Sequence, residues 1–504
     1  MNANTAYEEL VRHAREQTLL DSCADLLEWD EETYMPAGGV GHRSEQRALL
    51  AGLSHQRATD PRVGELLGEL EGSELGLDPE APAAANVREL RRLYDRQTRI
   101  PRALAEELAR TTALAHQAWV AARQNADFAP FRPWLERIVA LKRSEAESVG
   151  YEDDAYDALL DHYEPGARSR ELVRLFDALR QELVPLAAAI AESPRQPRLA
   201  VLERDFPVER QRVFVEAVAA TLGFDFTRGR LDTSAHPFCT GIGPGDCRFT
   251  TRFDARNLCS GLLGVLHEVG HALYEQGLDP EYYGTPLGEP ASLGVHESQS
   301  RLWENRVGRS RAFWEHVFPR AREVFHEALH DVTLDDFHFA VNAVAPSVNR
   351  VDADEVTYNM HVLVRFELER ALLAGDLEAA DVPAAWNEAY RHYVGVTPAN
   401  DADGCLQDSH WAGGLIGYFP TYTLGDVLGA QLFAKASAEL GDLDSAFRAG
   451  EFGGLREWLR QNVHRHGRRY SSAALAARVT GSPPDYRPLV EALRARYAAL
   501  YGIA

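Results

Sequence analysis

The sequence predicts a mainly α-helical protein, and three observations support this fold class. Long segments rich in alanine, leucine, glutamate and arginine carry apolar residues three and four positions apart, which is the spacing of one face of an α-helix. Stretches that contain proline and glycine, at 72–85 and 193–198, separate these segments. A short region at 231–253 instead has the composition of a β element. We therefore expect one large helical body over residues 1–504, with a small β element near 231–253.

The expected helices follow one another along the chain. They span 97–125, 132–149, 168–192, 207–222, 319–333 and 484–501. A further helix is expected from Ala255 to Gln276, because this stretch lacks proline and repeats leucine at three- and four-residue steps. It should end at Gly277, since glycine commonly follows the last turn of a helix.

The β element is expected just before that helix. Glycine and proline turns in 231–253 are followed by Cys247–Phe253, where residues alternate as they do along a short strand. An exposed sheet edge at this place would allow an extended peptide backbone to bind by strand addition.

Composition and charge exclude several classes of protein. The net charge of −23 argues against nucleic-acid binding, because there is no excess of Lys and Arg to neutralise phosphates. No segment approaches the roughly 20 uninterrupted apolar residues that a membrane helix needs. The polar N-terminus lacks the apolar core of a secretion signal. The five cysteines form no CxxC pair and their number is odd, so we expect free thiols and a cytoplasmic location.

The sequence His267-Glu268-Val269-Gly270-His271 is the most informative stretch of the chain. Two histidines four positions apart on a helix point to the same side and can bind one metal ion. Glu268 lies close enough to that face to hold a water molecule at the metal. The pattern is that of a hydrolytic zinc site.

A catalytic zinc site needs a third protein ligand and an open position for water. The metzincin extension of the motif would place glycine at 274 and histidine at 277, but the chain has Tyr274 and Gly277. The third ligand should therefore be a carboxylate from a following helix, and Glu275 on the same helix is expected to be a solvated neighbour. Spacing alone leaves three candidates, which are Glu289, Glu297 and Glu304.

Six sequence blocks occur in a fixed order along the chain. They are His236-Pro237-Phe238, Asp246–Thr250 (DCRFT), His267–His271 (HEVGH), His296-Glu297-Ser298, Arg350–Asp354 (RVDAD) and Gly404–Trp411 (GCLQDSHW). In this order and spacing the chain resembles the carboxypeptidase Taq family of zinc metallocarboxypeptidases, with its blocks HPF, DxRxT, HExxH, HES or HGQ, IRxxAD and GxxQDxHW. The stretches 29–39, 417–425 and 464–470 also look like the family. One departure is Asn349, where the family pattern has isoleucine, so local packing or pocket polarity should differ there.

The resemblance implies roles for the residues around the motif. It makes His267, His271 and Glu297 the zinc ligands and makes Glu268 the general base and later the proton donor. It also implies peptide substrates with a free C-terminal carboxylate, broad specificity, a deep active-site groove with zinc at its floor, and a homodimer. Two histidines and a carboxylate suit Zn²⁺ and would accept Co²⁺.

Further residues are candidates for substrate binding and for stabilising the transition state. The negative charge that develops on a tetrahedral intermediate needs hydrogen-bond donors, and His410, Tyr418 and Tyr422 are candidates. Tyr422 is favoured because 417–425 resembles the tyrosine-bearing loop of related zinc oligopeptidases.

A carboxypeptidase must also hold the α-carboxylate of its substrate, and a guanidinium does so with two charge-assisted hydrogen bonds. Arg350 is the first candidate, and Arg248 is the second or an orienting residue. His236 could line the subsite near the scissile bond.

Two alternative functions remain open from the sequence. A zinc endo-oligopeptidase on the same helical scaffold would not require Arg350, whereas an aminopeptidase would carry an upstream GxMxN motif that is absent here. A non-enzymatic helical metal-binding protein would close its site with four protein ligands, and Glu268 inside the motif argues against it.

Overall fold

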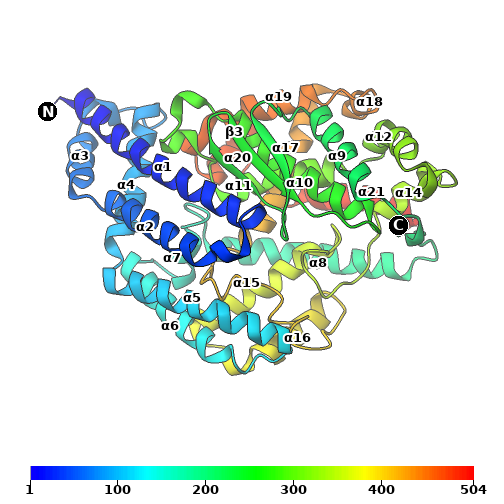
Figure 1. Ribbon diagram of the computed structural model, residues 1–504, viewed down its shortest axis with the longest axis horizontal. Helices are drawn as coiled ribbons and strands as arrows, with labels where there is room; N and C mark the ends of the chain where they lie inside the picture. The colour runs from blue at the N-terminus through cyan, green and yellow to red at the C-terminus, as the bar shows by residue number, and fades with distance from the viewer. Residues whose placement is uncertain (1, 504) are drawn as a thin grey trace. The chain divides into compact units, whose positions relative to one another are not determined.

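The computed structural model describes residues 2–503, which form two compact units. Unit 1 contains residues 2–97, Pro197–Val341 and Gly429–Pro483, and unit 2 contains Thr98–Gln196, Asn342–Leu428 and residues 484–503. Figure 1 follows the chain through both. The expectation of a single peptidase domain over 1–504 stays a prediction.

Unit 1 is built mainly from helices, with one small sheet. Its first segment holds α1 (Ala3–Thr33), η1 (Ala37–Gly39), α2 (Val40–Ala58), α3 (Pro61–Glu71), η2 (Glu74–Gly76) and most of α4 (Pro82–Arg99). Its second segment begins with η3 (Leu199–Val201), α9 (Val208–Leu222), β1 (Gly229–Thr233), β2 (Cys239–Gly243), β3 (Asp246–Thr251) and α10 (Leu258–Gly277). It continues with η4 (Pro280–Tyr282), η5 (Pro286–Gly288), α11 (Leu293–Arg301), the π-helix η6 (Leu302–Val307), α12 (Arg311–Val324), α13 (His326–Leu329) and α14 (Leu334–Val341). The third segment holds the end of α17 (Pro420–Leu440), then α18 (Leu443–Arg448), α19 (Gly453–Asn462), η8 (His464–Arg469) and α20 (Ser472–Thr480).

Among the described residues of unit 2, all the regular secondary structure is helical. Its elements are α5 (Arg102–Asn125), α6 (Arg132–Val149), α7 (Ala155–Leu160), α8 (Ser169–Glu192), α15 (Tyr358–Ala374), η7 (Ala379–Asp381), α16 (Val382–Tyr393), the start of α17, and α21 (Arg487–Tyr501). α5 packs against α6, and α15 packs against α16 (Figure 1).

The sheet in unit 1 has the strand order β1-β3-β2. β3 runs parallel to β1 and antiparallel to β2, and the register between β2 and β3 shifts between Gly241 and Gly243. β3 lies against α10 (Figure 1), where Thr251 Oγ1 donates to the carbonyl oxygen of Gly261 at 3.2 Å. The central strand therefore supports the helix that carries the HExxH motif.

α10 begins and ends for reasons visible in its sequence. The side chain of Asn257 caps the helix by accepting a hydrogen bond from the backbone N–H of Ser260. The last residue is Gly277, where an added Cβ would lie 2.3 Å from Nδ1 of His464. Glycine is required there by the close approach of His464.

The mainly α-helical fold with a small β element near 231–253 is confirmed, and two expected helix boundaries are wrong. The expected helix 97–125 is interrupted, because α4 ends at Arg99 and α5 begins after Pro101, which lacks a backbone N–H. The expected helix 319–333 is also broken. α12 continues through Pro319 to Val324, and Phe325 then leaves the helical conformation with φ −113° and ψ 45°.

Two composition-based expectations can be compared with the structure. All five cysteines are free thiols, as expected, and the Sγ atoms of Cys239 and Cys247 lie 3.8 Å apart on neighbouring strands. Across residues 2–503, none of the helices has both the length and the apolar character needed to span a bilayer.

Candidate functional site

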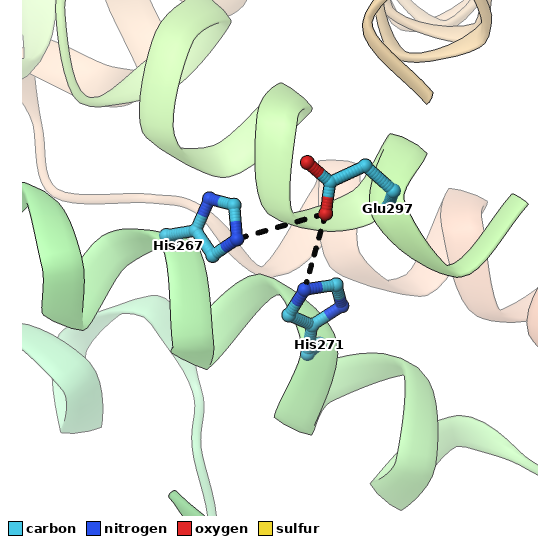
Figure 2. A group of neighbouring side chains, drawn as sticks. All are labelled: His267, His271 and Glu297. Atoms are coloured by element: carbon cyan, nitrogen blue, oxygen red, sulfur yellow. Dashed lines mark ion pairs between the residues drawn. The ribbon is translucent and has the colours of Figure 1, made fainter. Parts of the chain in front are cut away.

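The two histidines of the HExxH motif and a glutamate from the next helix converge in unit 1. His267 and His271 lie one turn apart on α10, and Glu297 lies on α11 (Figure 2). Oε2 of Glu297 is 3.6 Å from Nε2 of His267 and 3.4 Å from Nε2 of His271. Figure 2 shows both rings directed at this one carboxylate oxygen.

α11 can lie this close to α10 because glycine stands at the point of contact. A Cβ added to Gly270 would lie 2.5 Å from the carbonyl oxygen of Gln299 and 2.6 Å from Cα of Ser300. On another helix, a Cβ at Gly429 of α17 would lie 2.7 Å from the carbonyl oxygen of Ser298. Backbone atoms cannot swing aside as side chains do, so these glycines fix the depth at which Glu297 sits.

His267 is held by a second carboxylate. Its Nδ1 lies 2.9 Å from Oε2 of Glu304, which belongs to the π-helix η6. A carboxylate at Nδ1 keeps a proton on that nitrogen, so that Nε2, which faces Glu297, is the nitrogen that can bind a metal ion. π-Helical turns are rare and frequently lie at functional sites.

Glu297 is also fixed by neighbours on its own helix. Nε of Arg301 donates to its Oε1 at 2.8 Å, and Oγ of Ser300 donates to its Oε2 at 2.9 Å. The carboxylate is buried, with Glu297 6% exposed. These donors stabilise the ionised form that a metal ligand requires.

His271 is held differently from His267. Its Nδ1 is buried and has no hydrogen-bond partner among the described residues. The ring instead stacks on His296 at 4.4 Å between centroids and 14° between planes. Nε2 of His296 lies 3.0 Å from Oε1 of Glu275. The expectation that Glu275 is a solvated neighbour is therefore wrong, because packing of α11 brings His296 against it.

The electrostatics of this group favour two ionised carboxylates and one neutral histidine. Burial raises the pKa of Glu297, but His267, Arg301 and His271 outweigh burial and lower that pKa well below its usual value. Burial also opposes ionisation of Glu304, yet its bond to His267 and the charge of Arg301 lower its pKa to about 2. Burial lowers the pKa of His271 to about 3.

His267 and Glu268 have pKa values shifted upward. Burial would lower the pKa of His267, but Glu297, Glu304 and Glu268 raise it to about 9. Burial is the main cause that raises the pKa of Glu268 to about 7. The charge of His267 lowers this pKa, whereas the charges of Glu297 and Glu304 raise it. A carboxyl group with a pKa near the working pH is suited to general acid–base catalysis.

These residues fit a divalent transition metal. The ligand atoms of His267, His271 and Glu297 all lie within 4.8 Å of one another, and they form the one group of this kind within residues 2–503. Two imidazole nitrogens and one carboxylate oxygen are a ligand set that zinc accepts, with a fourth position left open. The two rival glutamates do not join the group. Glu304 holds His267, and Glu289 pairs with Arg468 at 2.8 Å.

In unit 2, Arg350, the first candidate for binding the substrate carboxylate, lies in a buried cluster of charged side chains. Arg350 is 6% exposed, and both its Nε and its Nη2 donate to Oδ1 of Asp408, at 3.2 and 3.0 Å. Its Nη1 donates to Oη of Tyr358 at 3.2 Å. Oδ2 of Asp408 accepts from Nε of Arg365 at 2.7 Å. Two guanidinium groups thus share one carboxylate, which leaves an excess of positive charge.

The three candidate oxyanion donors lie beside this cluster. Nε2 of His410 is 3.2 Å from Oη of Tyr422, and the His410 ring lies 5.4 Å from that of Tyr418. The guanidinium of Arg350 lies over the Tyr422 ring at 4.7 Å. Burial, reinforced by Arg350 and Arg365 against Asp408, lowers the pKa of His410 to about 4, so this histidine is neutral at neutral pH.

Within the described residues of unit 1, neither His236 nor Arg248 forms a hydrogen bond or an ion pair with His267, His271 or Glu297. His236 is exposed in the loop between β1 and β2. Arg248 donates from Nε and Nη2 to the carboxylate of Asp246, at 2.8 and 2.7 Å, and its guanidinium lies 4.3 Å from the Trp29 ring centroid. The Nε and Nη2 donors of Arg248 are therefore already bonded to Asp246, a neighbour on the same strand.

Sequence reasoning missed the residues that hold the candidates in place. Asp408 and Gln407 stand inside the GxxQDxHW block, so that block was the available signal for them. Arg365 and the π-turn that carries Glu304 had no signal in the sequence. Asn349, the departure from the family pattern, bonds within its own loop, where its Nδ2 donates to Oδ2 of Asp352 at 2.5 Å.

The comparisons with known proteins agree over almost the whole chain. The family model described as carboxypeptidase Taq (M32) metallopeptidase matches residues 9–497. The chain is 51% identical to thermostable carboxypeptidase 1 of Thermus thermophilus, over 100% of both chains. It is 37% identical to thermostable carboxypeptidase 1 of Pyrococcus furiosus, over 98% of this chain and 99% of the relative. Among solved structures, the M32 carboxypeptidase from Deinococcus radiodurans R1 superposes with a TM-score of 0.96 at 43% identity, covering 99% of this chain and 100% of that one.

Proposed function

The chain belongs to the carboxypeptidase Taq (M32) metallopeptidase family and is a metallocarboxypeptidase; on this premise we propose that it uses zinc to release C-terminal amino acids from peptides with broad specificity. The proposal makes His267, His271 and Glu297 the metal ligands. The observation that carries it is the convergence of their three ligand atoms within 4.8 Å, with Glu268 next to the first histidine. Membership in the family sets aside the endo-oligopeptidase and the non-enzymatic alternatives.

The metal would supply the chemistry that side chains cannot. A zinc ion held by the three ligands would polarise the scissile carbonyl and lower the pKa of a water molecule toward about 7. Co²⁺ should support the same chemistry, because it accepts the same ligand set and geometry.

Glu268 is assigned the proton transfers. Its carboxylate takes a proton from the attacking water and later gives the proton to the leaving amine. Two features support this role. Glu268 is 6% exposed, so bulk water does not compete strongly for its carboxyl group, and burial raises its pKa to about 7.

Arg350 is assigned the recognition of the terminal carboxylate. The cluster in unit 2 contains two guanidinium groups and a single contacting carboxylate, Asp408, so it carries a surplus positive charge. Arg365 is fully buried, whereas Arg350 keeps 6% of its surface exposed. A buried surplus of positive charge is costly unless an anion balances it, and the substrate carboxylate is such an anion.

His410 and Tyr422 are assigned to stabilise negative charge on the tetrahedral intermediate, with Tyr418 as a substrate-binding neighbour. Because the pKa of His410 is lowered to about 4, its ring is neutral and acts as a hydrogen-bond donor or acceptor rather than as a cation. We assign His236 to the subsite near the scissile bond and Arg248 to an orienting role, since its guanidinium is already bonded to Asp246.

The substrate partner is a peptide with a free C-terminus, and no nucleic-acid or membrane partner is proposed. We also propose a homodimer in the cytoplasm. Sedimentation equilibrium would test the dimer, and a single species at the monomer mass would contradict it.

The experiment that tests the function uses one peptide in two forms. The free acid and its C-terminally amidated twin are digested with and without a chelator and followed by mass spectrometry. We expect stepwise loss of C-terminal residues from the free acid only, abolished by the chelator and restored by Zn²⁺ or Co²⁺. Internal cuts in both peptides would contradict the proposal. A peptide series that varies the last residue tests broad specificity.

A further inference from the structure

We propose that Asp408 is a positioning residue for Arg350, because it occupies one edge of the guanidinium and so directs the other edge to the substrate carboxylate. This inference rests on the proposed role of Arg350 in carboxylate recognition. The two hydrogen bonds from Arg350 to Asp408 would hold the guanidinium in a single orientation.

The contacts of Arg350 account for three of its five N–H groups. Oδ1 of Asp408 accepts one from Nε and one from Nη2, at 3.2 and 3.0 Å. Tyr358 accepts one from Nη1 at 3.2 Å. Nη1 and Nη2 therefore keep one N–H each. These two atoms form the end of the guanidinium, and such a pair matches the spacing of two carboxylate oxygens.

Asp408 cannot simply rotate away from Arg350, because its second oxygen is also held. Oδ2 of Asp408 accepts from Nε of Arg365 at 2.7 Å. Arg365 is itself fixed, since its Nη1 donates to the carbonyl oxygen of His361 at 2.6 Å. Its guanidinium also lies 4.6 Å from the Trp386 ring centroid. Asp408 thus connects the long side chain of Arg350 to Arg365, which is fully buried and held in place.

The residue before Asp408 fixes the backbone of the arginine. Oε1 of Gln407 accepts from the backbone N–H of Arg350 at 3.0 Å, and its Nε2 donates to the carbonyl oxygen of Val348 at 2.9 Å. Gln407 therefore holds the main chain on both sides of residue 349. Two consecutive residues set both the position and the orientation of Arg350.

The charges around the pair favour an anion at the open edge. Asp408 is the one carboxylate that contacts either guanidinium within residues 2–503. The two nearby histidines, His361 and His410, add no further charge, because burial lowers the pKa values of both and favours their neutral forms. Without Asp408, the two guanidinium groups would repel each other, and Arg350 would lose its preferred direction.

The test is a double-mutant cycle between Asp408 and Arg350, with peptide cleavage as readout. The variants are Asp408→Asn, Arg350→Ala and the double variant, and Asp403→Asn is the control because it removes an exposed carboxylate from the same loop. For each variant we would measure KM and kcat on the free-acid peptide, cleavage of its amide, zinc content and the thermal midpoint.

We expect Asp408→Asn to raise KM for the free acid by about 10- to 100-fold, the loss typical of a charge-assisted contact, with zinc content unchanged. Added to Arg350→Ala, it should cause no further loss, since Asp408 acts through Arg350. Asp403→Asn should behave as the wild type.

Separate outcomes overturn the two ideas. If Arg350→Ala leaves the preference for free acid over amide intact, the proposed role of Arg350 fails. If Arg350→Ala abolishes that preference but Asp408→Asn does not weaken it, the positioning role fails. A further loss in the double variant would make Asp408 a purely structural residue. If Asp408→Asn does not fold, Arg365→Lys provides the same test, because it removes the Nε donor that holds Oδ2 of Asp408. We then expect KM for the free acid to rise, and an unchanged KM would contradict the proposal.

Discussion

Gly270 faces the backbone of Gln299 so closely that a Cβ at position 270 would lie 2.5 Å from that carbonyl oxygen. Gly270 is one of the two variable residues of the HExxH motif, and Gln299 lies two residues after Glu297. The contact therefore joins the helix with both histidines to the helix with the glutamate at the level of the metal centre. The distance between α10 and α11 decides whether the three ligand atoms can meet.

We expect Gly270→Ala to damage metal binding as well as stability. The new methyl group meets backbone atoms, so α11 must shift, at a cost of about 1–3 kcal/mol. Zinc affinity should fall because Glu297 moves with α11. The matched control is Gly68→Ala in α3, where nothing lies within 4 Å of an added Cβ and stability should rise by about 0.5–1 kcal/mol. Titration with a competing chelator and thermal unfolding measure both quantities. Unchanged zinc affinity in Gly270→Ala would contradict this account of the contact.

Replacing each of the three glutamates that spacing allowed as the third ligand should change the zinc affinity by a different amount. Glu297→Ala removes a ligand and should abolish stoichiometric zinc. Glu304→Ala removes the carboxylate that holds Nδ1 of His267 and should lower the affinity for zinc by about 10- to 100-fold. Glu289→Ala breaks a surface pair with Arg468 and should have no effect. Metal analysis after dialysis at several free zinc concentrations ranks the variants, and full zinc in Glu297→Ala would refute the ligand set.

Glu268→Gln should keep the metal and lose turnover. The amide has nearly the same shape as the carboxylate but cannot take a proton from water, so kcat should fall by about 10²- to 10⁴-fold. Zinc content should match the wild type, because Glu268 contributes no ligand atom to the group. Activity close to that of the wild type would rule out Glu268 as the general base.

Glu369 should make stability decrease as the pH rises. It is fully buried in unit 2 and accepts hydrogen bonds from Tyr156, Trp411 and the backbone N–H of Gly417. Burial outweighs these donors and raises its pKa from 4.5 to about 7. The folded chain therefore keeps this proton at pH values where the unfolded chain has released it. The contribution is full below about pH 4.5 and is lost as the pH rises through 7.

Glu369→Gln, which is neutral at every pH, removes this dependence. The stability of the wild type relative to the variant should fall by about 2–3 kcal/mol between pH 5 and pH 8.5. Denaturant midpoints at the two pH values measure it, with Glu388→Gln on the exposed side of α16 as control. An equal difference at both pH values would show that Glu369 does not titrate in this range.

The sequence predicted the parts of the centre that depend on local periodicity. The four-residue spacing of His267 and His271 places both on one face of any helix, so no tertiary information was needed for them. The composition of 231–253 likewise marked the β element. The helix boundary at Phe325 was not predictable, because 319–333 keeps an apolar stripe through the break and Pro319 is accommodated inside α12.

The third metal ligand could not be identified from local spacing. From spacing, Glu297 and Glu304 were equivalent, since both lie on the segment that returns toward α10. The structure separates them through the π-turn at Leu302–Val307, which directs Glu304 to the Nδ1 side of His267 while Glu297 faces Nε2. The family resemblance favoured Glu297 before any geometry was known.

The sequence by itself determined the helical fold class, the metal-binding pair, the adjacent base and the family. The fold class, the metal-binding pair and the base follow from residue type and short-range spacing, whereas the family follows from the order of six sequence blocks between His236 and Trp411. Only the tertiary structure decided how deep α11 packs, which atoms hold His267 and Glu297, and how Asp408 divides its two oxygens between Arg350 and Arg365. Apart from the bonds of Glu297 to Ser300 and Arg301 on its own helix, these relations join residues 29 to 58 positions apart. Their energies depend on burial and on atomic distance, which short-range spacing does not reveal.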